Sequence, residues 1–287
     1  MTSLKEVKGR IATVNNTRKI TSAMKMVASA KLHKAQGAIG NMLPYENSLH
    51  RLLTNFLRGG GVVSPYVTER EVKRVALVVF SSNSSLCGGF NANVIKHATA
   101  LLEGYETLGK ENILIYPIGK KVADALIKSG YQVQGDYQQM ANHPSFAEAA
   151  SLAQELMELY VQGKVDRVEI LYNHFKSMAT QILTHEVYLP VPLQSVSAEE
   201  PVEEVDYILE PSREELLTLL LPKVLRMKLY TALLDSNASE HAARTMAMQI
   251  ATDNADDLLQ ELTLMYNKTR QQAITNELLD IVGGSMA

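Results

Sequence analysis

The C-terminal quarter of the chain carries a helical pattern too long for a small domain to cover. From about Pro211 to Val282 the sequence has one internal proline, Pro222, and no glycine. A helix of roughly 70 residues extends about 105 Å, because each residue adds about 1.5 Å. A compact α/β core of about 140 residues has a radius of gyration near 14 Å. We therefore expect most of this helix to project from any globular part of the chain.

A second long helical pattern lies at the N-terminus, from Leu4 to about Arg58. Pro44 predicts a kink, because its ring clashes with the preceding turn, and the three glycines at 59–61 predict the end of the helix. Small and apolar residues form a near-heptad stripe that Arg18 and Lys25 interrupt. The stripe consists of Leu4, Val7, Ile11, Val14, Thr21, Ala28, Leu32, Ala35, Ile39 and Met42.

We expect the two terminal helices to form a long antiparallel coiled coil. If residue 57 faces about residue 212, Met24 lies near Thr245 and the last turns from about Asn267 stay unpaired. In this register the basic residues near the N-terminus would face an acidic stretch at 256–261. Pro222 predicts a kink or a later helix start near residue 223. The expected C-terminal stripe is Leu216, Leu220, Met227, Leu234, Met248, Ala251, Ala255, Leu258, Leu262, Met265, Leu278 and Ile281.

Between the terminal helices the hydrophobic period changes to an alternation of strands and helices. This alternation predicts a small, mostly parallel α/β domain with helices on the faces of the sheet. The expected strands are 75–80, 113–118 and 167–172 with an edge strand at 181–189, and the expected helices are 91–103, 120–128 and 145–161. The predicted domains are 1–58, the N-terminal shaft helix; 59–210, the α/β base domain with an extended connection; and 211–287, the C-terminal shaft helix.

Composition excludes several classes of function. A formal net charge of -3 predicts no attraction to nucleic acid, and no apolar run reaches the 18 or so residues of a membrane span. A single cysteine forms no internal disulfide and favours a reducing compartment. The first 34 residues hold eight basic side chains and one acidic, as a transit peptide would, but the helical pattern continues to residue 43 without a break. We therefore do not expect a transit peptide.

No catalytic, metal or cofactor site is expected. The turn at 81–89 follows a buried strand, where phosphate loops occur, but it matches no phosphate-binding or nucleophile motif. Cys87 has no assignable base, and the seven histidines form no metal-binding pattern, so His174 and His185 are expected at the surface. The methionines at 24, 26, 246 and 248 fit either core filling or contact with a second partner.

Four ordered motifs resemble the γ subunit of F-type ATP synthases. They are KGRIATVNNTRKITSAMKMVASAK at 8–31, LCGGFN at 86–91, ASEHAARTMAM followed by ATDNA at 238–255, and YNKTRQQAITNEL at 266–278. The resemblance implies a central rotor shaft inside a ring of three α and three β subunits. Its base would meet the ε subunit and the c-ring, through which alone it would contact the membrane. Proton flow would drive rotation and ATP synthesis, with no catalytic residue or cofactor in this chain.

The same resemblance assigns contacts to individual residues. Met24, Lys25, Arg244 and Met246 would face an acidic loop of β, and Arg270, Gln271, Thr275 and Glu277 would contact the ring higher up. Tyr207 and Glu210 would form the foot near the c-ring and ε, and the tip at 278–282 would sit in an apolar sleeve. The implied location is peripheral, on the cytoplasmic face of the bacterial inner membrane.

Two departures and two rival readings remain. Ser84-Ser85 stands where the family has Arg-Gly, and Pro222 lies where relatives continue the helix. One rival is an α/β enzyme with helical arms that binds a nucleotide at the turn 81–89. The other is a generic coiled-coil scaffold, against which the charged interruptions of the stripe argue.

Overall fold

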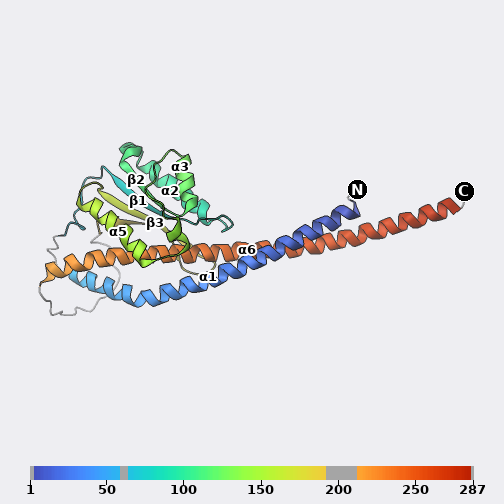
Figure 1. Cartoon of the computed structure of the whole chain (residues 1–287), viewed down its shortest axis with the longest axis horizontal. Coiled ribbons are helices and arrows are strands. Elements are labelled where there is room, and N and C mark those ends of the chain that lie inside the picture. Colours follow the sequence, from blue (N-terminus) through green and yellow to red (C-terminus); the bar gives the residue numbers. More distant parts are fainter. Residues whose placement is uncertain (1–2, 59–63, 192–211, 286–287) are drawn as a thin grey trace. The chain divides into compact units, whose positions relative to one another are not determined.

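The computed structural model describes residues 3–58, 64–191 and 212–285. Their contacts group into two compact units, the first made of 1–29 with 244–287 and the second of 30–243. Two long helices, α1 (Leu4–Arg58) and α6 (Arg213–Ser285), each contribute residues to both units. The α/β domain belongs to the second unit (Figure 1). A small, mostly parallel α/β domain with long terminal helices is the fold that the sequence predicts.

Each long helix begins at a serine that caps it. The backbone N–H of Glu6 donates to Ser3 Oγ at 3.2 Å, and that of Glu215 donates to Ser212 Oγ at 3.2 Å. Both starts are Ser-x-x-Glu sequences, which satisfy amide groups that the first helical turn leaves unpaired. Because α6 starts nine residues before Pro222 and continues through it, the expected later start near residue 223 is wrong. Pro44 likewise lies inside α1 without ending it.

The sheet has four strands in the order β2-β1-β3-β4. The strands β1 (Val75–Phe80), β2 (Ile113–Ile118) and β3 (Arg167–Phe175) are parallel, and β4 (Gln181–Leu189) pairs antiparallel with β3 at the edge. All six residues of β1 are buried, as the continuous apolar run predicts for a central strand. The expected strands are confirmed, except that β3 is three residues longer than predicted.

Helices cover both faces of the sheet (Figure 1). On one face α2 (Phe90–Gly104) and α3 (Lys120–Lys128) pack on Leu77 and Val79. On the other face α5 (Phe146–Val161), the short α4 (Gln138–Asn142) and part of α6 pack on Val78 and Phe80. Two 3-10 turns, Glu106–Leu108 and Lys110–Asn112, lead into β2. The three longer helices match their predicted positions, whereas α4 is absent from the prediction.

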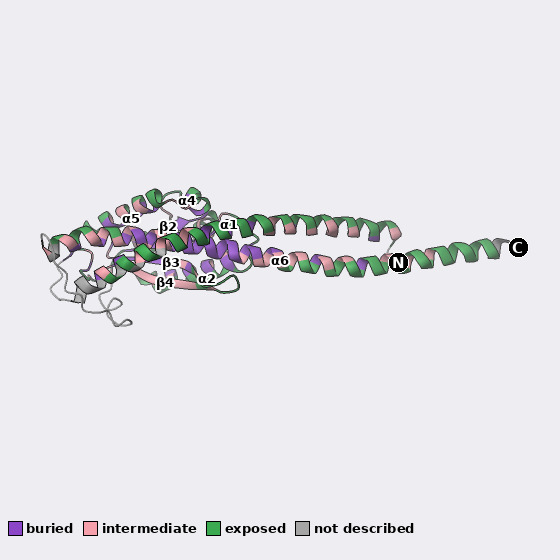
Figure 2. Cartoon of the chain, turned by 90° about the horizontal axis from the view of Figure 1, so that it is seen from below, coloured by how far each residue is buried: buried purple, intermediate pink, exposed green. Residues whose placement is uncertain are grey.

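Within the second unit, every residue of α6 from 232 to 242 is buried, so this part of the helix is covered on all sides (Figure 2). Leu229 and Leu233 join the core beneath the sheet, and Ala238 and Ala242 pack against Leu32 of α1 and its neighbour Ala35. This stretch carries mostly small and polar residues around the whole helix, and its two acidic residues, Asp235 and Glu240, are buried as well.

In the first unit, α1 and α6 run antiparallel in a register one turn away from the expected one. The hydroxyl oxygens of Thr21 and Thr252 lie 2.8 Å apart, and Lys25 Nζ donates to Gln249 Oε1 at 2.8 Å. Met24 was expected near Thr245, four residues before the partner of Lys25, so that register is wrong. Arg18 forms an ion pair with Asp256 at 2.8 Å, although basic residues nearer the N-terminus were expected there.

The seam on α6 also differs from the predicted stripe. Met248, Ala255 and Leu262 are buried, as expected, whereas Leu258 is 40% and Met265 45% exposed. Thr252, Leu259 and Tyr266 are partly buried between the buried positions and complete the seam at near-heptad spacing. The stripe was wrong here because α6 has apolar residues on two faces, of which the pairing with α1 covers one. On α1, by contrast, every predicted stripe position from 4 to 39 is buried or partly buried.

Candidate interaction surface and the crevice at the strand ends

Two predicted contact residues, Met24 and Lys25, lie on α1 in the first unit. Both are partly buried, whereas the neighbouring Met26 is 63% and Val27 59% exposed. Lys25 reaches across to Gln249, whose Nε2 donates to Asp253 Oδ1 at 2.7 Å. The two charged residues that interrupt the stripe, Arg18 and Lys25, are therefore the ones that cross the seam.

The other two residues of this predicted group lie on α6. Arg244 is only 8% exposed and Met246 is partly buried. Lys25 bonds to Gln249, which lies one helical turn after Met246 on α6. That Arg244 and Met246 adjoin Met24 and Lys25 stays a prediction.

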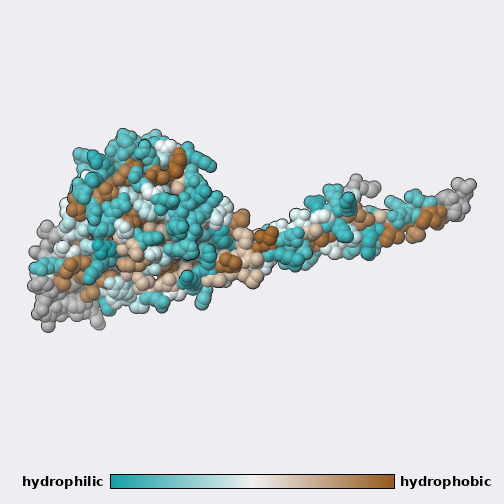
Figure 3. Space-filling view, in the orientation of Figure 1, coloured by the Kyte–Doolittle hydropathy of each residue, from teal (hydrophilic) through white to brown (hydrophobic). Residues whose placement is uncertain are grey.

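The last turns of α6 are exposed on all sides of the helix. Arg270, Gln271, Thr275 and Glu277 are all exposed, and Thr275 Oγ donates to the carbonyl of Gln271 at 2.9 Å. Every residue from 274 to 282 is exposed. Five of them are large and apolar, between 48% and 68% exposed, and give the hydrophobic surface toward the end of α6 in Figure 3: Ile274, Leu278, Leu279, Ile281 and Val282. Exposed apolar residues in such density mark a surface that another molecule covers.

The predicted foot residues, Tyr207 and Glu210, lie outside the described residues. So does most of the predicted connection, 192–211, and the glycine triplet begins directly after the last residue of α1.

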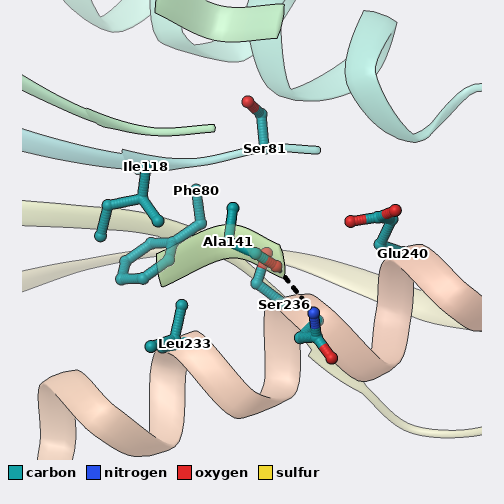
Figure 4. A pocket seen from close by; sticks show the side chains of 8 residues that line it. Phe80, Ser81, Ile118, Ala141, Leu233, Ser236 and Glu240 are labelled. Atoms are coloured by element: carbon teal, nitrogen blue, oxygen red, sulfur yellow. Dashed lines mark hydrogen bonds between the residues drawn. The ribbon is translucent and has the colours of Figure 1, made fainter. Parts of the chain in front are cut away.

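The crevice at the carboxyl ends of the strands, where ligands bind in doubly wound sheets, is filled by α6. Phe80, Ser81 and Ile118 at the strand ends face Leu233, Ser236 and Glu240 of α6 (Figure 4). Asn237 Nδ2 donates to the carbonyl of Ala141 at 2.9 Å and ties α6 to α4. The remaining cavity is about 10 Å³, room for about one water. Pockets for organic ligands are typically about 300 Å³ or more.

The turn after β1 is held by its own side chains. Ser82 Oγ donates to the carbonyl of Ser84 at 2.6 Å, and Asn91 Nδ2 lies 3.1 Å from the sulfur of Cys87. Cys87 is 1% exposed, and Leu86 has a positive φ of 68°. The cysteine is therefore part of a packed turn, and its burial keeps bulky reagents from the thiol.

Three carboxylates, of which Glu169 and Asp235 are buried and Glu186 is partly buried, join elements of the second unit, and the sequence singles out none of them. Glu169 on β3 is 2% exposed and accepts hydrogen bonds from Tyr105 at 2.6 Å and His185 at 2.9 Å. Burial alone would raise the pKa of Glu169, but the bonds from His185 and Tyr105 outweigh it and lower the pKa. His174 and His185 were expected at the surface, and each is at least partly exposed.

The other two carboxylates hold α6 to the sheet. Glu186 on β4 accepts from Lys228 Nζ at 2.5 Å and from Tyr172 at 2.8 Å. Burial opposes ionisation of Glu186, yet Lys228 and Tyr172 lower its pKa. Asp235 on α6 lies 2.7 Å from His174 Nδ1, and here burial dominates and raises the pKa. No sequence motif marks these contacts, because the partners are far apart in the chain.

Within the described ranges, no helix is both long and apolar enough to cross a membrane. Over those residues the structure also holds no cluster of three or more histidine, cysteine or carboxylate side chains suited to a metal ion.

Comparison with known proteins decides the family. A family model described as ATP synthase matches residues 3–287. The ATP synthase gamma chain of Phocaeicola vulgatus is 66% identical over the full length of both chains, and that of Bacteroides fragilis is 63% identical, again over both full lengths. The chain belongs to the ATP synthase gamma-chain family. Members of this family form the central stalk of F-type ATP synthases.

Solved structures agree on the fold of this gamma-chain family member. A chain from the Euglena gracilis mitochondrial ATP synthase, in a structure of OSCP, F1 and c-ring, gives a TM-score of 0.65 at 20% identity, covering 99% of this chain and 93% of that one. A chain from the central stalk and c-ring of the Tetrahymena thermophila enzyme gives 0.59 at 24% identity, covering 81% and 99%.

Proposed function

We propose that this chain is the rotating shaft that couples proton flow through the membrane to ATP synthesis and hydrolysis. Its helix pair turns inside a ring of three α and three β subunits, and its base engages the ε subunit and the c-ring. The chain has no catalytic residue of its own. It lies at the cytoplasmic face of the bacterial inner membrane, which it contacts only through the c-ring.

One observation carries this proposal beyond family membership, namely the second apolar face of α6. Leu258 and Met265 at the edge of the seam with α1, and Leu264 on the far side of the helix, are 40% to 71% exposed. A residue turned away from the seam gains nothing from being apolar unless a further partner covers it. A surrounding ring covers all sides of a shaft, which fits the fully exposed circumference of the last turns.

The predicted ring contacts follow from this arrangement. Met24 and Lys25 present a partly exposed edge to an acidic loop of β, and Arg244 and Met246 on α6 contribute to the same contact. Arg270, Gln271, Thr275 and Glu277 are fully available to the upper ring. Tyr207 and Glu210 form the foot toward the c-ring and ε.

The absence of catalytic chemistry is supported by the crevice at the strand ends. A nucleotide-binding α/β enzyme needs that crevice open, whereas α6 leaves about 10 Å³ there. The rival enzyme would therefore have to displace α6 from the strand ends before binding a nucleotide.

Reconstitution tests the proposal. Purified α and β subunits would be mixed with and without this chain and assayed for assembly and Mg-ATP hydrolysis. We expect a complex with one copy of the chain and a higher turnover than α and β give alone. If a competent set of α and β subunits gives no complex, while the chain forms stable oligomers with itself, the chain is a coiled-coil scaffold and the shaft hypothesis is wrong.

A further inference from the structure

The pairing of α1 with α6 in the first unit changes character along its length. From residue 4 to residue 14 the seam positions of α1 are apolar, and each is buried or partly buried: Leu4, Val7, Ile11 and Val14. The next three seam positions, at 18, 21 and 25, are polar, and the buried Ala28 follows them. Arg18, Thr21 and Lys25 therefore form one polar heptad within the seam.

Two members of the polar heptad carry charge across the seam. Arg18 Nη1 lies 2.8 Å from Asp256 Oδ1. Lys25 Nζ donates to Gln249 Oε1 at 2.8 Å, and the Nε2 of Gln249 donates to Asp253 Oδ1 at 2.7 Å, so the acceptor of Lys25 is itself held in place. The side chains of Arg18 and Asp256 are 40% and 45% exposed, and ion pairs that water reaches contribute little to stability. What these contacts supply is therefore geometry more than energy.

Thr21 makes the third contact, which joins two hydroxyl groups. The hydroxyl oxygens of Thr21 and Thr252 lie 2.8 Å apart. Each also lies within bonding distance of a carbonyl of its own helix, Thr21 at 3.0 Å from that of Arg18 and Thr252 at 2.8 Å from that of Met248. One hydroxyl therefore donates across the seam while the other donates to its own helix. Thr21 is only 9% exposed, and a valine there would bury more apolar surface.

The three contacts are made together in one register. The residue numbers of the two partners add up to 273 or 274 in every pair. A shift of seven residues keeps a heptad pattern in phase, but one direction sets Thr21 against Leu259, and the other sets Lys25 against Ala242. Apolar contact has no direction and tolerates such a shift, whereas a hydrogen bond weakens steeply when it is stretched or bent.

We propose that Arg18, Thr21 and Lys25 are positioning residues that hold α1 and α6 in a single register within the first unit. A polar side chain inside a coiled-coil seam selects one register at a cost in stability. The apolar seam at 4–14 supplies attraction between the helices, and the polar heptad selects among the pairings that this attraction allows. The register is a property of the free chain, so this inference stands or falls independently of the proposed shaft function.

The test measures the distance between two spin labels on the full-length chain by pulsed electron paramagnetic resonance. Cysteines that carry the labels replace Lys8 on α1 and Asn276 on α6, both exposed, while Cys87, 1% exposed, is left in place. In the observed register residue 8 faces about residue 266, so Asn276 lies about ten residues or 15 Å further along. A shift by one helical turn changes this axial separation by about 5 Å. An excess of unlabelled chain removes distances between copies.

The main variant makes the polar heptad apolar and combines Arg18→Met, Thr21→Val and Lys25→Met. Its control makes the same three changes at exposed positions of α1, Arg10→Met, Thr17→Val and Lys19→Met. Thr17 matches Thr21 closely, because its hydroxyl also donates to a carbonyl of its own helix, at 3.1 Å.

We expect one distance in the parent chain and in the control. In the main variant a second distance, displaced by about 5 Å or more, should appear in at least about one fifth of the molecules. Amide hydrogen exchange over residues 4–17 should be no faster in the main variant than in the parent, because an apolar seam is at least as stable as a polar one.

A second distance in the main variant without faster exchange supports the proposal. A single, unchanged distance in the main variant overturns it, and so does an equal second population in the control. Faster exchange with an unchanged distance would show that the polar heptad only stabilises the pair. If the main variant fails to fold, Thr21→Val with Thr252→Val removes the hydroxyl pair at nearly constant shape, and its distances are compared with those of Thr17→Val. Identical distances in these two chains would again overturn the proposal.

Discussion

Single acidic residues that are buried or partly buried in the second unit show how polar groups can hold a fold together. Glu169, Glu186 and Asp235 each receive a hydrogen bond or ion-pair contact from another element. A buried carboxylate is tolerated because such contacts replace the water it loses. Sequence patterning could not find them, since an acidic residue in a strand reads as solvent-facing unless its distant partner is known.

The first prediction concerns Glu169 and acid stability. Because its pKa is lowered in the folded chain, it contributes stability that is complete above its unfolded pKa and is lost as the pH falls through the folded value. We expect Glu169→Gln to lower the free energy of unfolding by about 1–3 kcal/mol at pH 7. Urea unfolding of the full chain measures this difference.

The pH dependence gives the prediction its control. Between pH 7 and acid conditions below the pKa, the difference between the parent chain and Glu169→Gln should shrink. Glu71→Gln, at an exposed site, should change the unfolding free energy by less than about 0.5 kcal/mol at either pH. A difference for Glu169→Gln that stays constant with pH would show that its charge plays no part.

The second prediction concerns the glycine between β2 and α3. Gly119 has a φ of +111°, and a Cβ there would lie 2.2 Å from the backbone oxygen of Ser81. Gly119→Ala should therefore destabilise the chain by about 2–4 kcal/mol. Gly104 ends α2, and a Cβ there meets nothing within 4 Å, so Gly104→Ala should be neutral or slightly stabilising. Equal melting temperatures of the two variants would contradict this.

At the scale of elements, the sequence predicts helix and strand positions well and their register less well. Strong periodicity places α3 and β1 at the observed bounds. The short α4 is missed because five residues carry too little periodic pattern. The register was anchored at the helix ends, but Leu53 already clusters with Leu217 and Leu221. The error of one turn arises because helical spacing alone does not fix which residues of two helices face each other.

The third prediction tests this register. Thr21→Cys combined with Thr252→Cys should form a disulfide on mild oxidation, because the two hydroxyl oxygens are 2.8 Å apart. Met24→Cys with Thr245→Cys, the pairing that the sequence suggests, should not cross-link. Cys87 can be retained, since it is buried. Non-reducing electrophoresis and mass spectrometry distinguish the outcomes, and each single-cysteine variant serves as a control.

At the scale of the whole molecule, the central feature is a helix with apolar residues on two faces. One face is used within the chain, and the sequence alone could not separate the two because both follow helical spacing. The resemblance of the motifs, rather than periodicity, points to the partner of the second face. Family membership is confirmed over residues 3–287, while the individual contacts stay predictions.

The fourth prediction concerns Met24 in the assembled enzyme. Met24→Lys places a charged, strongly hydrated ammonium group on a partly buried edge of α1. It should therefore impair coupling more than assembly. The measurement compares ATP-driven proton pumping with ATP hydrolysis in reconstituted vesicles. Met178→Lys, at an exposed methionine of the second unit, should leave the ratio unchanged. An unaltered ratio of proton pumping to ATP hydrolysis for Met24→Lys would argue against a role of Met24 in the contact with the ring.

The most direct test of the shaft function is to watch the chain turn. The α and β subunits are fixed to a surface, and a visible probe is attached to the chain through a cysteine introduced at exposed Lys164. With Mg-ATP we expect rotation in one direction with three stops per turn, one for each of the three β subunits in the proposed ring. A complex that hydrolyses ATP at full rate while the probe stays still would contradict the account.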